Sequence, residues 1–110
     1  MALIPVGRED QIRDGELVPI EVAGVAMILY RTGDRYVAVQ RHCIHQRADL
    51  VHGHLDGPFL VCPVHGWRYH ATTGVHELSP QTCLRTYAVH VHGGNIHVDP
   101  TPMWQGEIIP

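Results

Sequence analysis

Two short stretches of the chain each bring one cysteine and one histidine together, and they constrain its fold more than any other feature. The first is Cys43-Ile44-His45 and the second is Cys62-Pro63-Val64-His65. Both pairs are flanked by residues typical of turns and strand ends, so we expect each pair on a loop. Two loops that face each other supply two thiolates and two imidazoles, which is a metal-binding donor set. The sequence therefore predicts a metal centre at Cys43, His45, Cys62 and His65.

Two kinds of metal centre use this donor set. In an iron–sulfur cluster the cysteines bind one iron and the histidines the other. Structural zinc sites more often use a CxxC pair followed by histidines on a helix. Neither a CxxC pair nor a helical HxxxH occurs in this sequence. The iron–sulfur interpretation is therefore favoured, and a zinc-stabilised interaction module remains the alternative.

Composition limits the setting of this centre. With 110 residues, 8 Lys+Arg and 11 Asp+Glu, the chain forms one small domain with a charge of -3, which favours neither nucleic acid nor an anionic membrane as a partner. No apolar run reaches the roughly 18 residues of a membrane span, and no secretory signal is visible, so we expect a cytoplasmic protein. Three cysteines in that compartment indicate metal chemistry, with Cys83 a buried free thiol.

The first half of the chain reads as short strands. Leu17–Ile20 and Val25–Tyr30 are apolar and β-prone, and Tyr36–Val39 pairs with the second of them across a loop at Arg31–Arg35. The only helical signal is a single turn at Arg8–Ile12. An all-β fold follows from this pattern.

The second half continues in the same way. Phe59–Val61 and Arg68–His70 are strands joined by the second ligand loop. From Tyr87 to His92 apolar and polar residues alternate, which predicts a half-buried strand that turns at Gly93-Gly94 and returns through Asn95–Asp99.

The end of the chain is predicted to leave the sheet. Pro100-Thr101-Pro102 is expected to end the ladder, because proline lacks the N–H that a ladder needs. We therefore divide the chain into a domain at 1–99 and a tail of the same domain at 100–110. The segment Met103–Pro110 is either loose or a strap packed by Trp104, and the sequence leaves both open.

The residues around the ligands resemble a known family. The run from Cys43 to Leu50, followed by Cys62 to Tyr69, is similar to the two cluster-binding loops of Rieske-type ferredoxins, and the likeness covers about residues 3–99. The resemblance implies an antiparallel β-sandwich with a cluster-binding subdomain made of the two ligand loops. It implies one [2Fe-2S] cluster per chain, with Cys43 and Cys62 on the buried iron and His45 and His65 on the outer iron.

Three positions distinguish the branch of that family. Respiratory Rieske proteins carry two further cysteines, joined as a disulfide, at the positions of Ala48 and Val64, and a sulfide-binding serine at the position of Trp67. Tyr69 matches a tyrosine whose hydroxyl bonds a cysteine sulfur. With one hydrogen bond to a sulfide missing, the resemblance implies a low reduction potential.

The resemblance also implies a function. Ring-hydroxylating oxygenases with similar motifs are far longer, because a second domain carries their catalytic iron, so this chain is expected to be an electron-transfer component without its own enzymatic activity. It would take electrons from an NAD(P)H-dependent flavin reductase and pass them to a terminal oxygenase that degrades aromatic hydrocarbons, as a monomer or weak oligomer. The small Rieske-type subunit of an assimilatory nitrite reductase is the alternative of the same family.

The residues beside the ligands and most of the remaining histidines are expected at the surface. A docking tip beside the ligands is expected to comprise Gln46, Arg47, Pro63, Val64 and Trp67. The histidines that are not ligands are expected mostly at the surface, and they are His42, His52, His54, His70, His76, His90, His92 and His97.

Overall fold

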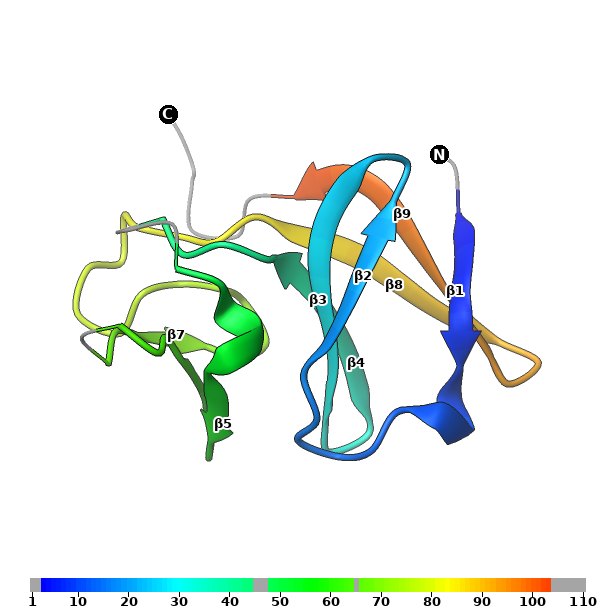
Figure 1. Ribbon diagram of the computed structural model, residues 1–110, viewed down its shortest axis with the longest axis horizontal. Coiled ribbons are helices and arrows are strands. Elements are labelled where there is room, and N and C mark those ends of the chain that lie inside the picture. Colours follow the sequence, from blue (N-terminus) through cyan, green and yellow to red (C-terminus); the bar gives the residue numbers. More distant parts are fainter. Residues whose placement is uncertain (1–2, 45–47, 65, 104–110) are drawn as a thin grey trace.

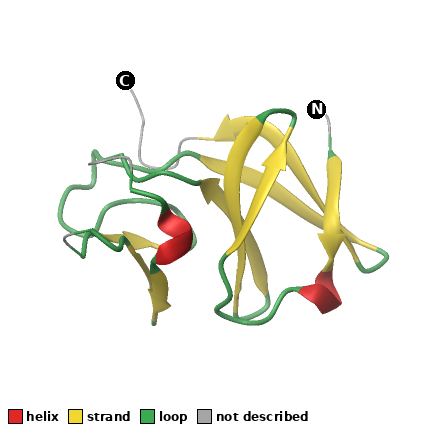
Figure 2. Ribbon diagram, viewed as in Figure 1, coloured by secondary structure: helices red, strands yellow, loops and turns green. Residues whose placement is uncertain are grey.

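The computed structural model describes residues 3–44, 48–64 and 66–103, and these form two antiparallel sheets with two short 3-10 helices (Figures 1 and 2). The larger sheet has six strands in the order β1-β9-β8-β4-β3-β2, and the smaller has the order β5-β6-β7. The predicted all-β class is confirmed. The element bounds are β1 Ile4–Arg8, η1 Glu9–Gln11, β2 Val18–Val22, β3 Val25–Thr32, β4 Arg35–Gln40, η2 Leu50–His52, β5 His54–Asp56, β6 Phe59–Val61, β7 Arg68–His70, β8 Thr86–His92 and β9 Asn95–Met103.

The first six residues of strand β3, Val25–Tyr30, form an apolar run because the middle of the strand is buried on both faces. Successive side chains of a strand point to opposite faces. Met27 and Leu29 accordingly pack in a cluster within the large sheet, whereas Ile28 and Tyr30 pack in a second cluster towards the small sheet. A strand that buries both faces has no need of polar residues at alternate positions.

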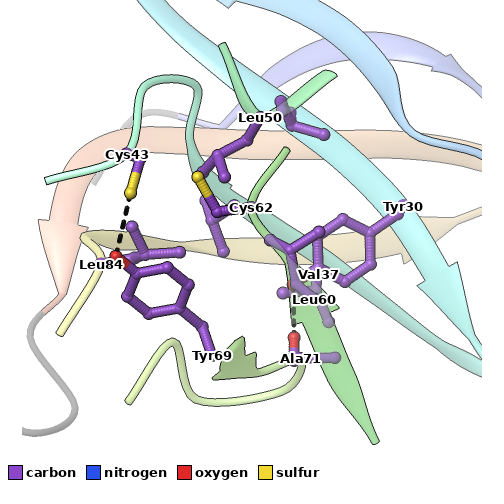
Figure 3. Close-up of a cluster of buried hydrophobic side chains, with 11 residues drawn as sticks. Tyr30, Val37, Cys43, Leu50, Leu60, Cys62, Tyr69, Ala71 and Leu84 are labelled. Carbon is purple, nitrogen blue, oxygen red and sulfur yellow. Dashed lines mark hydrogen bonds between the residues drawn. The ribbon is translucent and has the colours of Figure 1, made fainter. Parts of the chain in front are cut away.

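The second of these hydrophobic clusters joins the two sheets and contains Cys43 and Cys62. Tyr30 of β3 reaches across it, and its hydroxyl donates a hydrogen bond to the carbonyl of Ala71 after β7 (Figure 3). Burial raises the pKa of Tyr30, so the hydroxyl remains protonated and able to donate. The buried members of this cluster are Ile28, Tyr30, Val37, Val39, Cys43, Leu50, Leu60, Cys62, Tyr69, Ala71 and Leu84.

The first hairpin turn is tighter than predicted. The sequence suggested a loop at Arg31–Arg35, but Thr32 pairs with Arg35, which leaves only Gly33 and Asp34 between the strands. Gly33 has a φ of 67°, which a two-residue hairpin turn of this kind requires. The polar residues on either side are therefore strand residues at the end of the sheet. The single helical turn predicted at Arg8–Ile12 is present as η1.

The prediction that the ladder ends at Pro100 is wrong. Strand β9 continues to Met103, where Tyr87 pairs with Pro102 and the hydroxyl of Thr86 donates to the carbonyl of Met103 at 3.0 Å. The pairing of β9 with β1 reaches only to Val98. Beyond that point β9 has one neighbouring strand, and prolines are tolerated on such an edge. The division of the chain at residue 99 stays a prediction, and residues 104–110 lie outside the described part.

The alternating burial predicted for β8 is found only in part. Thr86 and Tyr87 are both buried, while His90, Val91 and His92 are all exposed. The register shifts between Tyr87 and Val89, so burial follows distance from the turn and not strict alternation.

Among the described residues, no helix is long and apolar enough to cross a membrane.

Candidate metal centre

The first cysteine lies in a loop whose two ends are bonded to each other. Cys43 follows β4, and its N–H donates to the carbonyl of Ala48 at 2.8 Å, while the N–H of Leu50 donates to the carbonyl of Arg41 at 2.8 Å. Asp49 accepts from the Arg41 guanidinium through Nε at 3.0 Å and Nη2 at 2.8 Å. It also accepts from the N–H of Val51 at 3.1 Å and so caps the N-terminus of η2. This carboxylate therefore fixes both ends of the first ligand loop.

The Asp49 carboxylate makes the stability of this loop depend on pH. Its hydrogen bonds with Arg41, followed by that from Val51, hold the pKa of Asp49 below its usual value. A carboxyl group with a lowered pKa stabilises the fold above its unfolded pKa of about 4, and this contribution is lost as the pH falls through the lower folded value. We predict that Asp49→Asn lowers Tm by a few °C at pH 7 and that the difference shrinks below about pH 4.

Thermal unfolding of Asp49→Asn and of a matched variant, Asp34→Asn, measures this effect. Asp34 is exposed in the hairpin turn between β3 and β4, so its variant makes the same change of charge elsewhere. A Tm difference between wild type and Asp49→Asn that stays constant from pH 7 to pH 3 would contradict the prediction.

The second cysteine stands between β6 and β7, as the sequence predicted. The N–H of Cys62 donates to the carbonyl of Trp67 at 2.7 Å, which closes the loop. Gly66 has a φ of 65°, and a Cβ at this position would meet nothing within 4 Å beyond its chain neighbours. Glycine is therefore favoured here because it adopts this left-handed backbone without strain.

The two thiols face each other in the interior. Cys43 and Cys62 are each 1 % exposed, and Figure 3 shows their sulfur atoms side by side. Burial raises the pKa of the Cys62 thiol, the N–H of Val64 opposes that shift, and the adjacent Cys43 thiol adds to it. Two buried neighbouring thiols ionise together only when a cation neutralises them. This pair therefore fits a thiolate-bound iron.

A hydroxyl group is aimed at one of these sulfurs. Tyr69 of β7 lies with its Oη 3.1 Å from Cys43 Sγ (Figure 3). Burial, followed by the contact with Cys43, raises the pKa of Tyr69 far above its usual value. A tyrosine that stays protonated donates a hydrogen bond to a thiolate, so the role expected from the resemblance is consistent with this geometry.

The predicted ligands His45 and His65 lie outside the described residues. Within the described ranges, no group of three or more metal-binding side chains comes together. The structure thus places two of the four predicted ligands beside each other and leaves the histidine half as a prediction. Cys83 is also buried, as expected, and its thiol donates to the carbonyl of Leu84 at 3.2 Å.

The three residues that distinguish this chain from respiratory Rieske proteins contribute to packing around the cysteines. Ala48, Val64 and Trp67 are partly buried and contact the cluster of buried residues that contains both cysteines. Of the remaining residues of the expected docking tip, Pro63 is exposed, and Gln46 and Arg47 lie outside the described part.

Most of the non-ligand histidines are exposed, as expected, and His76 is the buried exception. His76 is only 8 % exposed, and its ring lies edge-on to Trp67, with centroids 4.6 Å apart, and to Tyr69, with centroids 5.4 Å apart. It follows β7 in a segment without alternation, so no local pattern distinguishes it from the exposed histidines. Its burial arises because Tyr69 and His76 form an isolated β-bridge that brings this segment back over the second ligand loop.

Residues 2–88 match the family model of the Rieske [2Fe-2S] domain. The chain is 36% identical to ferredoxin CarAc of Metapseudomonas resinovorans over 78 residues, which is 70% of this chain and 73% of the relative. It is 30% identical over 96 residues to the ferredoxin component of the alkene monooxygenase system of Xanthobacter autotrophicus, covering 86% of this chain and 78% of the relative.

A solved structure agrees with these relatives. The chain superposes on a chain of the complex of reduced oxygenase and oxidized ferredoxin in carbazole 1,9a-dioxygenase with a TM-score of 0.83 and 28% identity. The superposition covers 92% of this chain and 95% of that one. The backbone of this chain thus follows the fold found in that complex of an oxygenase and a ferredoxin.

Proposed function

The chain belongs to the Rieske [2Fe-2S] domain family, and from that premise we propose that it carries single electrons from an NAD(P)H-dependent flavin reductase to a terminal oxygenase of the aromatic-ring dioxygenase type. The observation that carries this proposal is the pair of buried, adjacent thiols of Cys43 and Cys62, with the Tyr69 hydroxyl on one of them. The relative from an alkene monooxygenase system and the solved complex of an oxygenase with a ferredoxin support an oxygenase as the partner of this chain.

The proposed ligand set is Cys43, His45, Cys62 and His65. When bound, a [2Fe-2S] cluster supplies reversible one-electron chemistry. The cysteines would hold the iron on the buried side, because both thiols are enclosed by the core. The histidines would hold the other iron. Their neutral imidazoles would add no negative charge to the cluster and would offer electrons a route to the surface.

The chain itself controls the surroundings of the thiolates. The N–H of Val64 stabilises negative charge at Cys62, and the Tyr69 hydroxyl does so at Cys43. Such hydrogen bonds favour the more negative, reduced state of a cluster and raise its potential. The low potential implied by Trp67 in place of a serine stays a prediction.

Replacement of Tyr69 by phenylalanine tests this control. We predict that Tyr69→Phe retains the cluster and lowers its reduction potential by about 40 mV, because roughly 1 kcal/mol of preferential stabilisation of the reduced state equals that potential for one electron. Protein-film voltammetry measures the shift. Tyr36→Phe is the control, since Tyr36 packs against the hydrophobic residues within the large sheet, which include neither motif cysteine. An unchanged potential in Tyr69→Phe would contradict the role.

The function itself is tested by reconstitution. The purified protein is expected to be red-brown, to give a rhombic electron paramagnetic resonance signal on reduction, and to be required for NAD(P)H-dependent turnover by a flavin reductase and a ring-hydroxylating oxygenase. A colourless protein that contains zinc would contradict the assignment.

Genomic neighbours test the other alternative. Genes for an oxygenase and a reductase beside this one are the expected result, whereas a nitrite reductase gene would favour the nitrite reductase subunit. The alkene monooxygenase relative and the carbazole 1,9a-dioxygenase structure both come from oxygenase systems, so the oxygenase assignment is preferred. The proposed compartment is the cytoplasm, where the nicotinamide-dependent reductase would work.

A further inference from the structure

The segment after β7 presents an unusually exposed apolar side chain. Leu78 is 79 % exposed, whereas the next most exposed large apolar residue in the described part of the chain, Ile44, is 44 % exposed. A single exposed apolar residue is common on protein surfaces and needs no explanation by itself. The surroundings of Leu78 are what make this one informative.

The turn that carries Leu78 is rigidly built. The N–H groups of Leu78 and Ser79 donate to His76 Nδ1 at 3.0 Å and 3.1 Å. The N–H of Glu77 donates to the carbonyl of Arg68 at 2.9 Å, and the two side chains form an ion pair at 3.4 Å. Leu78 is therefore held in water by a fixed backbone and does not lie on a loose loop.

The histidine at the base of the turn is not the residue that packing alone favours. Because Nδ1 accepts two hydrogen bonds, the ring proton is on Nε2. That atom is buried and has no hydrogen-bond partner among the described residues. A phenylalanine would fill the same space beside Trp67 and Tyr69 without a buried, unpartnered donor. What histidine adds at this position is the acceptor that shapes the turn.

The turn lies at the end of the molecule through which electrons have to pass. His76 contacts Trp67 of the second ligand loop and Tyr69, which contacts Cys43. Figure 1 draws the segment between β7 and β8 at the same end as the two cysteine-bearing loops, away from β1. Electron tunnelling weakens steeply with distance, so an electron-accepting partner has to cover this end of the protein.

We propose that the 76–79 turn is a contact element for the terminal oxygenase, in which Leu78 enters an apolar recess of the oxygenase and His76 is its positioning residue. This inference rests on the proposed function. Binding energy at protein interfaces is concentrated in a few anchors that lose all their contact with water. An apolar side chain on a backbone that is already ordered meets that description, because the hydrogen bonds of the turn reduce the entropy lost on binding.

Transient kinetics of oxygenase reduction test the anchor. The reduced wild-type protein is mixed with a ring-hydroxylating oxygenase that accepts its electrons, and the rate is followed against protein concentration. We expect Leu78→Ser to raise the apparent Kd by about fivefold, at both low and high salt, because the contact is apolar. The limiting rate and the reduction potential are expected to stay unchanged. Val91→Ser is the matched control, since Val91 is 40 % exposed beside the turn at Gly93-Gly94.

Two variants of His76 separate positioning from packing. His76→Asn retains an acceptor that reaches the N–H groups two and three residues ahead, but it removes the ring. His76→Phe retains a ring but removes the acceptor. We expect His76→Phe to weaken oxygenase binding as Leu78→Ser does and His76→Asn to bind like the wild type.

The outcomes that overturn the inference are distinct from failure of the proposed function. Wild-type affinity in Leu78→Ser, or equal weakening in Leu78→Ser and Val91→Ser, would overturn the contact. Equal weakening in both His76 variants would overturn the positioning role. A wild-type protein that reduces no oxygenase while carrying its cluster would overturn the proposed function, and the contact with it.

Discussion

Cys62→Ala is expected to abolish cluster binding, whereas Cys83→Ala is expected to retain it. All three cysteines are buried, so burial does not distinguish them. Cys62 and Cys43 lie beside each other near the Tyr69 hydroxyl, while the Cys83 thiol donates to a backbone carbonyl. A cluster that loses one of its two thiolates is held on the buried side by Cys43 alone, which is too few ligands to retain it. The visible absorbance and the iron content should fall to background in Cys62→Ala alone.

The measurement combines visible absorption, iron analysis and electron paramagnetic resonance of the reduced proteins. Far-ultraviolet circular dichroism shows whether Cys62→Ala still folds, and Cys62→Ser provides a variant closer in shape if it does not. Oxygenase turnover should fall to background with the colour. A coloured Cys62→Ala protein, or loss of the cluster in Cys83→Ala, would show that the ligand assignment is wrong.

Gly53→Ala is expected to destabilise the protein by about 3 kcal/mol or more, which corresponds to a fall in Tm of at least about 10 °C. Gly53 follows η2, and a Cβ at this position would lie 2.1 Å from the carbonyl oxygen of Val61. That contact is with backbone, so it is relieved only if β6 moves away from the first ligand loop. Because Cys62 follows Val61, the same movement should reduce cluster content.

Gly7→Ala is the matched control for this substitution. A Cβ at Gly7 would lie 3.5 Å from Gln11 Oε1, which is an ordinary contact with a flexible side chain. We expect a change in Tm of no more than a few °C for this variant. Differential scanning calorimetry of both variants in the cluster-bound form measures the effect. Equal Tm values for Gly53→Ala and the wild type would contradict the close approach of the two segments.

The strands could be predicted wherever the signal is local. The apolar run of β3, the glycine turn before β9 and the two short strands on either side of the second ligand loop follow from neighbouring residues. The prediction failed at Pro100–Pro102 because it applied the rule for a central strand. That rule does not hold there, because β1 pairs with β9 only as far as Val98. Beyond Val98, β9 is an edge strand.

The donor atoms of the candidate centre could be predicted from the sequence because their chemistry belongs to the residue types. Two cysteines and two histidines in short pairs indicate a mixed iron–sulfur site wherever the chain places them. The structure brings Cys43 and Cys62 together, and His45 and His65 stay predicted ligands. The role of Tyr69 was available only through resemblance to a family.

What the sequence by itself determined was the all-β class and the net charge of -3, and it predicted the donor set of the metal centre. The tertiary structure alone decided which distant residues meet, such as Gly53 with the carbonyl of Val61, and His76 with Trp67. The physical reason is that ligand type and strand propensity are properties of a residue and its neighbours. Burial and close contact depend on how the sheets pair and pack, and no local pattern encodes that arrangement.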